Sequence, residues 1–123
     1  DLGHVFAFLA VEAAYSHGTE WLDQCLAYIQ GNIDYVDEFT KQHTPKIKVI
    51  RPQASFLVWL DCREMGFSQD ALNDFFVDKA HLALNNGVAF GEEGEGFMRL
   101  NVASPRSVLE QAMKQLADAY VKL

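Results

Sequence analysis

The sequence predicts an α+β fold: an α/β two-layer sandwich in which a small, mostly antiparallel sheet packs against helices. Helical periodicity marks a long segment near the N-terminus and another at the C-terminus, and short runs of β-branched and aromatic residues lie between them. The predicted order is helix, helix, strand, strand, helix, strand, strand, helix, which one sheet with covering helices satisfies. A chain of 123 residues, half of them apolar, is long enough for about one domain with its own core.

Two helices are predicted in the N-terminal third. Residues 4–15 are apolar nearly all round, and a helix of that kind needs burial on several sides. In a domain this small we expect it to lie exposed or to pack against another copy. Residues 19–42 form a second helix that ends at Thr44-Pro45. One face of this helix is marked by apolar residues three and four apart: Leu22, Leu26, Ile29, Ile33 and Val36.

Two strands are predicted next. Residues 46–52 carry Ile47 and Val49 on one face, and Pro52 ends the strand. Residues 54–62 are a continuous apolar run, which is typical of a central strand covered on both faces. The helices of this chain can cover one face, so we expect the second face to need a domain from elsewhere.

The C-terminal half alternates helix and strand. The helix at 69–80 is predicted to start from Ser68 as its N-cap and to bury Leu72, Phe75 and Phe76. The "NNG" within residues 82–90 indicates a turn or bulge before the strand at 97–103. Ser104 and Pro105 are expected as N-cap and first residue of the last helix. Its predicted apolar side comprises Val108, Leu109, Ala112, Met113, Leu116 and Tyr120.

The composition argues against several classes of function. Ten basic and 17 acidic residues give a net charge of −7 with no basic run, which argues against nucleic acid and anionic membranes as partners. The apolar stretches are too short to cross a bilayer. Cys25 and Cys62 belong to no CxxC motif, and we expect buried, reduced thiols of a cytoplasmic protein. The four histidines lack ligand spacing, so no metal site is expected.

One arginine is the candidate ligand-binding residue. In the strand 97–103, alternation places Met98, Leu100 and Val102 on the core face, and Phe97, Arg99 and Asn101 on the other. A guanidinium is always charged and offers two parallel donors, which suits a planar carboxylate. From the pattern alone, Arg99 is either a solvated surface residue or such a binding residue.

The glycine-rich segment "GEEGEG" at 91–96 offers no catalytic set. It precedes a strand instead of a helix, so it is no phosphate loop. Its three glutamates are interpreted as a hydrated turn, because turn residues hold no rigid pair of carboxylates for acid–base work.

Several motifs together resemble a known family. "PQASFLVWLDCREMG" at 52–66 and "NNGVAFGEEGEGFMRLNVASPRSVLEQAMKQL" at 85–116 look like the C-terminal part of class I/II aminotransferase-type, pyridoxal-phosphate-dependent enzymes of fold type I. Within that superfamily the sequence is most similar to the cystathionine β-lyase or C–S lyase branch, the MalY/PatB type. "AAYSHGTEWLDQCLAYIQGNIDYV" at 13–36 is similar to the helix that leads from the large domain into the small one.

The resemblance implies a role for Arg99. In such enzymes the arginine of this strand binds the α-carboxylate of an amino-acid substrate, and Asn101 and Ser55 would line the same cleft. The three glutamates would lie in the turn, away from the pocket. The resemblance further implies a cytoplasmic homodimer that uses pyridoxal 5'-phosphate to cleave sulfur amino acids into a thiol, pyruvate and ammonia.

The cofactor residues are expected outside this chain. The family's Schiff-base lysine commonly stands in a Ser/Thr-x-x-Lys setting, and none of the six lysines here has Ser or Thr three places earlier. The chain also begins "DLGHVFAF", already within an apolar helical pattern. We therefore expect a fragment, with 1–17 belonging to or leading from a missing large domain and 18–123 forming the small C-terminal domain, inactive by itself.

Three alternatives remain at this stage. The parent could be an aminotransferase on amino acids instead of a lyase. The chain could be a free-standing, non-catalytic α+β module that binds a small carboxylate through Arg99. It could also be an interaction domain that uses the apolar helix at 4–15 as its exposed patch.

Overall fold

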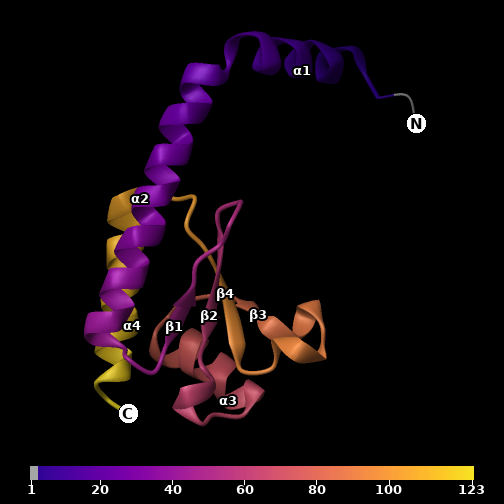
Figure 1. Cartoon of the computed structure of the whole chain (residues 1–123). Coiled ribbons are helices and arrows are strands. Elements are labelled where there is room, and N and C mark those ends of the chain that lie inside the picture. The colour runs from indigo at the N-terminus through magenta and orange to yellow at the C-terminus, as the bar shows by residue number, and fades with distance from the viewer. Residues whose placement is uncertain (1–2) are drawn as a thin grey trace.

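A computed structural model describes residues 3–123 and shows two projecting helices joined to an α/β sandwich (Figure 1). The expectation for 1–17 therefore lies partly outside the described residues. The helices are α1 (Val5–His17), α2 (Thr19–His43), α3 (Gln69–Asp74) and α4 (Arg106–Tyr120). The strands are β1 (Lys48–Ile50), β2 (Leu57–Asp61), β3 (Asn85–Asn86) and β4 (Phe97–Asn101). The predicted order of eight elements and the α+β class are confirmed.

The sheet is fully antiparallel, in the order β1-β2-β4-β3. Its central pair, β2 and β4, aligns Trp59 with Arg99 and Leu60 with Met98. Because side chains alternate along a strand, these two pairs lie on opposite faces. The sheet thus has a closed face, which carries Leu60 and Met98, and an open face, which carries Trp59 and Arg99.

The closed face forms the core. Val58, Leu60, Met98 and Leu100 are buried there, and α2, α3 and α4 contribute further buried side chains. These partners are Ile33 and Val36 from α2, Leu72 from α3, Phe75 and Phe76 from the π-helical turn that follows, and Leu109, Met113 and Leu116 from α4. The predicted cover of one face by these helices is confirmed. The alternate residues of β2, Leu57, Trp59 and Asp61, are only half-buried.

Two details of the helices differ from prediction. The N-cap of α4 is Pro105 instead of Ser104, and the first helical N–H, that of Arg106, donates to the Tyr28 hydroxyl at 2.6 Å. Val108 is exposed, so the buried side of α4 runs through Leu109, Met113, Leu116 and Ala119. Ser68 does cap α3, with its hydroxyl accepting from the Ala71 N–H at 3.3 Å.

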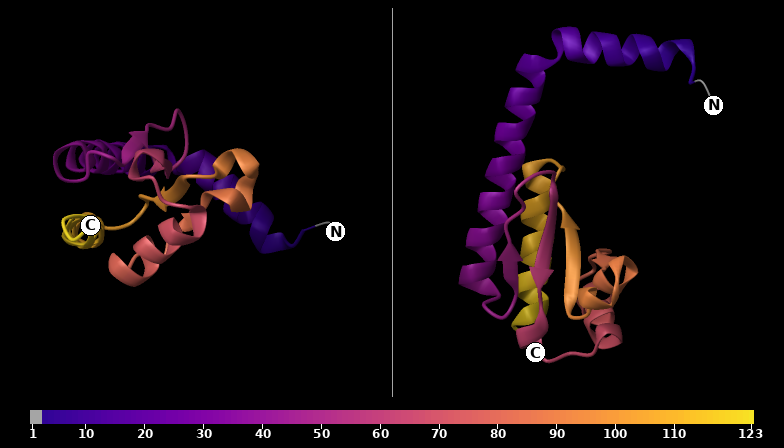
Figure 2. Two further views of the ribbon diagram at one scale, coloured as in Figure 1. Left: turned by 90° about the horizontal axis from the view of Figure 1, so that it is seen from below. Right: turned by 45° about the vertical axis from the view of Figure 1, so that its right-hand side comes forward.

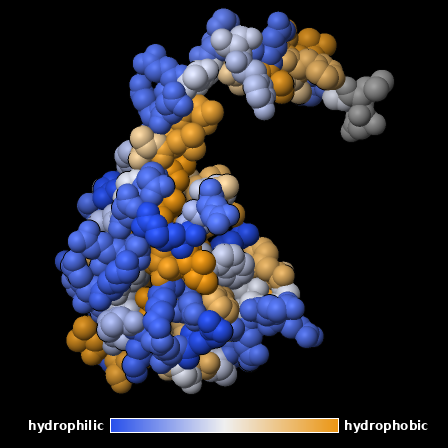
Figure 3. Space-filling view, viewed as in Figure 1, coloured by the Kyte–Doolittle hydropathy of each residue, from blue (hydrophilic) through white to orange (hydrophobic). Residues whose placement is uncertain are grey.

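The helix α2 is continuous over 25 residues but only its C-terminal half is buried. Ile33 and Val36 lie in the core, whereas Leu22 and Leu26 on the same predicted face are about half exposed. Together α1 and the first part of α2 stand away from the sandwich (Figure 2) and present an apolar surface (Figure 3). Every described residue of α1 is exposed, as predicted.

The bend between α1 and α2 occurs at Gly18. A Cβ there would lie 2.4 Å from the Ala14 carbonyl oxygen, which no side chain tolerates. None of the helices in the described part of the chain has the length and apolar character required to cross a membrane.

Candidate carboxylate-binding site

Arg99 lies in the middle of β4 on the open face of the sheet. Its neighbours across the two ladders are Trp59 of β2 and Asn85 of β3. Met98 and Leu100 on either side of it are buried against the helices, so the strand holds Arg99 at a fixed height above the core. The predicted alternation of β4 is therefore the alternation observed.

The guanidinium of Arg99 is held from two directions. Its Nη2 donates to Asn85 Oδ1 at 3.2 Å, and its Cζ lies 4.0 Å from the centre of the Phe90 ring. The Nε is buried and has no hydrogen-bond partner among the described residues. A stacked aromatic ring leaves the in-plane donors of a guanidinium available. The group is thus oriented but not neutralised, because no carboxylate of the described chain forms a salt bridge with it.

The glycines of "NNGVAFGEEGEG" explain how Phe90 reaches Arg99. The backbone of Gly87 runs so close to that of Gly94 that a Cβ on either residue would lie 2.1 Å from the other's carbonyl oxygen. The chain between them folds into two 3₁₀ turns, 87–90 and 92–94, and carries Phe90 back over the sheet. The loop is fastened by Gln69, whose side chain accepts from the Gly96 N–H and donates to Asn86 Oδ1, both at 2.6 Å.

Asn85 and Phe90 are partners of Arg99 that sequence reasoning missed. Both precede β4 in the chain, and "NNG" indicates a turn without indicating where its side chains point. The antiparallel pairing of β3 with β4 aligns Asn85 with Arg99, and the loop closed by Gly87 and Gly94 brings Phe90 to it.

A shallow cavity of about 290 Å³ lies beside this arginine. It is lined by Ile50, Trp59, Phe90, Glu93, Gly94 and Phe97. Trp59 meets the rings of Phe90 and Phe97 edge-on, with centroids 5.6 and 6.1 Å apart. Phe90 therefore contributes both to this cavity and to the stacking on Arg99.

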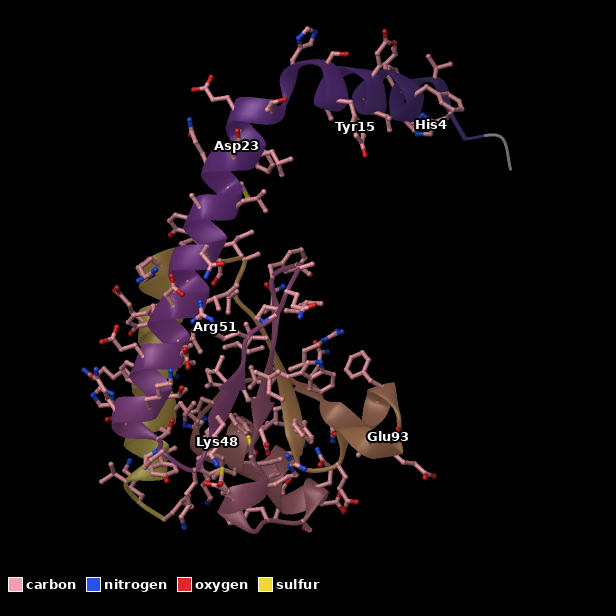
Figure 4. All side chains as sticks on the ribbon, in the orientation of Figure 1. His4, Tyr15, Asp23, Lys48, Arg51 and Glu93 are labelled. Atoms are coloured by element: carbon pink, nitrogen blue, oxygen red, sulfur yellow. The ribbon has the colours of Figure 1, made fainter. Side chains whose placement is uncertain are left out.

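The three glutamates of the turn are exposed, as predicted. Glu93 lines the cavity beside Phe90, whose lining does not include Arg99. That the glutamates lie away from a substrate pocket at Arg99 stays a prediction. Glu93 belongs to the loop between β3 and β4, whereas Lys48 lies on β1 at the far edge of the sheet (Figure 4). The Glu93 carboxylate lies at the rim of the cavity and forms no salt bridge with the Arg99 guanidinium in the described chain.

Asn101 and Ser55 lie at the same end of the sheet as each other. Asn101 ends β4 and is paired with Leu57, the first residue of β2, and Ser55 stands two residues before that. The Asn101 side chain is exposed and its Oδ1 accepts from the Ala103 N–H at 2.8 Å, which shapes the turn after β4. Ser55 is exposed with φ of 73°, a strained backbone for a residue other than glycine. Their roles in a cleft stay predictions.

The two cysteines differ in burial. Cys62 follows β2 and is buried, as predicted, but Cys25 is only half-buried because α2 is uncovered at that point. Both thiols are free. Burial raises the pKa of the Cys62 thiol to about 12, and the negative charge of Asp61 adds to the effect.

The residues of this chain do not fit a pyridoxal-phosphate site. A Schiff base needs a lysine in the pocket, and the cavity beside Arg99 holds none. Lys41 is paired with Asp37 on α2, and Lys48 is paired with Glu64. What the described residues provide here is an oriented guanidinium without a counter-charge, and no lysine lines the cavity beside it.

The chain is similar to curated and solved proteins over nearly its whole length. Cystathionine β-lyase PatB of Bacillus subtilis (strain 168) is 37% identical over 116 residues, which cover 94% of this chain and 30% of PatB. A PLP-bound putative aminotransferase from Clostridium difficile 630 superposes with a TM-score of 0.90 at 38% identity, covering 95% of this chain and 30% of that one. A putative PLP-dependent β-cystathionase from Corynebacterium diphtheriae gives 0.87 at 40% identity, with 98% and 32% covered. No family model matches.

The fold and the arginine-bearing sheet define the class: this chain has the structure of one part of the fold-type-I, pyridoxal-phosphate-dependent enzymes. Its sequence relatives include cystathionine β-lyases, as the motifs predicted, and, over a shorter part of the chain, aminotransferases. The chain spans about 30% of the length of the curated relatives that it matches.

Proposed function

We propose that this chain is the small C-terminal domain of a pyridoxal-phosphate-dependent C–S β-lyase, and that Arg99 binds the α-carboxylate of its substrate. The observation that carries the proposal is the state of the guanidinium. It is stacked on Phe90 and bonded to Asn85, yet its Nε is buried without a partner in the described chain. An oriented cation that has no counter-charge among the described residues is explained by an anion that arrives with the substrate.

In this proposal the work of the chain is to bind and orient. Two parallel N–H donors grip a carboxylate in one plane, which fixes the direction of the bonds at the substrate's α-carbon. Asn85 and Phe90 restrict the rotation of the guanidinium, so less freedom is lost when the substrate binds. The cofactor lysine belongs to a part of the protein outside this sequence.

The proposed substrates are sulfur amino acids with a thioether or thiol at the β-carbon. Cleavage consumes one water and gives a thiol, pyruvate and ammonia, so the β-carbon–sulfur bond breaks and no external oxidant is required. The resemblance also supports a cytoplasmic homodimer. In this arrangement residues 1–17 would belong to or lead from the large domain, and 18–123 would form the small one.

An aminotransferase is the second candidate, favoured by the similarity to the putative aminotransferase from Clostridium difficile. The same arginine would serve it, because both reactions start from a bound amino acid. The products separate the two: a transaminase returns the oxo acid with its sulfur side chain intact, whereas a lyase releases the thiol.

The test uses the longer protein that contains this chain, loaded with pyridoxal phosphate and given an S-alkyl cysteine. We expect equal amounts of thiol and pyruvate. Arg99→Ala should raise the KM about ten- to 150-fold, since a hydrogen bond to a charged group contributes about 1.5–3 kcal/mol. Arg99→Lys keeps the positive charge but loses the two parallel N–H donors, so its KM should lie between those of the wild type and Arg99→Ala. Unchanged kinetics in Arg99→Ala would remove the arginine from the site, and intact oxo acid without thiol would favour the transaminase.

A further inference from the structure

Asn32, in the middle of α2, makes three hydrogen bonds to the segment that directly follows the Arg99 strand. Its side chain has no solvent exposure. Its Nδ2 donates to the Val102 carbonyl at 2.8 Å and to the Ser104 carbonyl at 3.0 Å, and its Oδ1 accepts from Arg106 Nε at 2.8 Å. We infer that Asn32 is a positioning residue that sets where Arg99 stands relative to α2. The inference rests on the proposed function of Arg99.

The tie reaches the arginine through a short and rigid path. Val102 comes three residues after Arg99, and its own N–H donates to the Phe56 carbonyl at 3.0 Å. Residue 102 is therefore held on its carbonyl side by α2 and on its amide side by the residue before β2. Its side chain is also fully buried. If α2 moved along its axis, the hydrogen bonds of Asn32 would pull on the end of β4. Residue 102 cannot adjust freely, because it is bonded on both sides.

A second contact from the same helix face fixes the start of α4. The Arg106 N–H donates to the Tyr28 hydroxyl at 2.6 Å, and its guanidinium lies 4.7 Å from the centre of the Tyr35 ring. Residues 28, 32 and 35 are spaced by four and three, so they share one face of α2. The Tyr28 hydroxyl on this face accepts from the first N–H of α4, which has no side-chain cap of its own. The connection from β4 to α4 is thus held by α2 at both of its ends.

The position of Arg99 relative to α2 matters because, in the proposed function, the cofactor is bound by another part of the protein. The described residues contain no cofactor site beside Arg99, so the substrate's carboxylate must be presented toward another part of the protein. In the described chain, α2 is the element that continues from the sandwich into the projecting arm (Figure 2). Apolar packing tolerates small sliding movements, whereas hydrogen bonds are directional and fix the register. Asn32 is the residue that provides this directional tie between α2 and the end of β4.

The informative variant is Asn32→Asp. It keeps the shape and the acceptor for Arg106, but it removes both donors and sets a carboxylate oxygen against the carbonyls of Val102 and Ser104. Thr40→Val is the matched control on the same helix. Thr40 is also buried and polar, but its hydroxyl bonds only within α2, to the carbonyls of Val36 and Asp37. The control therefore removes a buried hydrogen bond without touching the β4–α4 connection.

The experiment compares two ligands of the pyridoxal-phosphate-loaded longer protein. One is an S-alkyl cysteine, and the other is the matching S-alkyl cysteamine, which lacks the carboxylate and is measured as a competitive inhibitor. With Asn32→Asp we expect the KM of the amino acid to rise about tenfold, kcat to change by less than about twofold and the Ki of the amine to stay the same. Thr40→Val should change none of these. Bound cofactor, followed by absorbance, should be equal in all variants.

A second readout does not depend on activity. Amide hydrogen exchange on the 123-residue chain should show faster exchange in residues 101–106 for Asn32→Asp and not for Thr40→Val. If Asn32→Asp does not fold, Arg106→Ala replaces it, because it breaks the Nε bond at a half-buried position and should shift KM in the same direction by about threefold.

Two results would overturn the inference. One is an unchanged amino-acid KM in Asn32→Asp, or in Arg106→Ala where that variant stands in. The other is an equal loss for amino acid and amine, which indicates a purely structural role. Arg99→Ala separates this from the proposed function: if Arg99→Ala leaves the preference for amino acid over amine intact, the carboxylate site itself is wrong, whatever Asn32 does.

Discussion

The two faces of the sheet are made by the same two strands but are built for different purposes. On the closed face, Leu60 and Met98 are completely buried beneath three helices. On the open face one position away, Trp59 and Arg99 remain half-exposed. The closed face contains only apolar groups in its central rows, while the open face has a cation without a counter-charge.

This difference predicts which substitutions should lower stability and which should weaken binding. A packed interior loses free energy when atoms are removed, because a cavity remains. A half-exposed cation contributes little to folding, because water already solvates it in the unfolded chain. Stability should therefore depend on the even-numbered positions of β2 and β4, and binding on the odd-numbered ones. Three predictions test that division and a fourth concerns a region outside both faces; they follow from the largest expected effect to the smallest.

The sharpest comparison is between two leucines of β2. Leu60→Ala should lower the free energy of unfolding by about 2–5 kcal/mol, because Leu60 is fully buried. Leu57→Ala on the other face should cost less than about half of that, because Leu57 is half-buried. Urea denaturation of both variants measures the difference. Equal costs would mean that the open face is covered in solution.

The cysteines offer a chemical comparison of a closed and an uncovered region. Cys62 is buried and its pKa is raised to about 12, first by burial and then by Asp61, so at pH 8 only about one thiol in ten thousand is ionised. Cys25 lies half-buried on the projecting part of α2. We expect iodoacetamide to modify Cys25 in the native chain and Cys62 only after denaturant is added. Mass spectrometry of the digested chain reads both sites, and rapid labelling of Cys62 in the native state would contradict the closed face.

Phe90 tests whether the open face is organised for binding. Phe90→Leu keeps an apolar side chain but removes the ring on which Arg99 stacks. We expect carboxylate binding to weaken by about 0.5–1 kcal/mol, or two- to fivefold in KM, with the free energy of unfolding changed by less than about 0.5 kcal/mol. Val88→Ala, at an exposed position in the same 3₁₀ turn, is the control. A loss of stability as large as the loss of binding would make Phe90 a packing residue.

The smallest effect concerns an ion-pair cluster outside both faces. Arg51, which follows β1, lies beside α2 (Figure 4). It pairs with Asp34 and with Asp37, the latter at 3.0 Å. Burial alone would raise the pKa of Asp37, but hydrogen bonds from Lys41 and Arg51 outweigh it, and the pKa is lowered. The hydrogen bond from Arg51 likewise lowers the pKa of Asp34.

The sign of the pH dependence follows from these lowered values. Near pH 4 the unfolded chain binds more protons than the folded one, so stability is complete above the unfolded carboxyl pKa of about 3.9 and falls as the pH drops through the lowered folded pKa. We expect the urea midpoint to decrease between about pH 4 and pH 2 and this decrease to be smaller in Asp37→Asn. Asp118→Asn on the exposed side of α4 serves as control. An identical acid profile in Asp37→Asn would show that the cluster contributes nothing.

Much of the fold was predictable because local signals agree with the final packing. The alternation of β4 predicted Met98 and Leu100 as core residues, and both are buried. The continuous apolar run of β2 predicted a central strand without indicating that Val58 and Leu60 are the residues facing the helices. The periodicity of α2 also marked the face of Leu22 and Leu26, but periodicity says that a face is apolar and not what covers it. These two leucines are therefore exposed although Val36 on the same helix is fully buried.

The candidate site was predictable only at its central residue. Arg99 stood out as a cation in an apolar strand, and the resemblance supplied its ligand. Asn85 and Phe90 were not predictable, because Asn85 reaches Arg99 through the pairing of β3 with β4 and Phe90 through the close approach of Gly87 to Gly94. Asn32 was missed because one polar residue within a helical pattern is usually solvated, and only the folded chain shows which carbonyls it meets.

The unbroken length of α2 has a mechanical consequence. At about 1.5 Å of rise per residue, Trp21 stands about 16 Å along the helix axis from Asn32. A tilt of about 5° centred on Asn32 would therefore move Trp21 by about 1.4 Å, while the sandwich below stays intact. Because the same helix is hydrogen-bonded through Asn32 to the segment after β4, a force on its exposed end would act as on a lever that pivots at Asn32 and would load the two bonds to Val102 and Ser104.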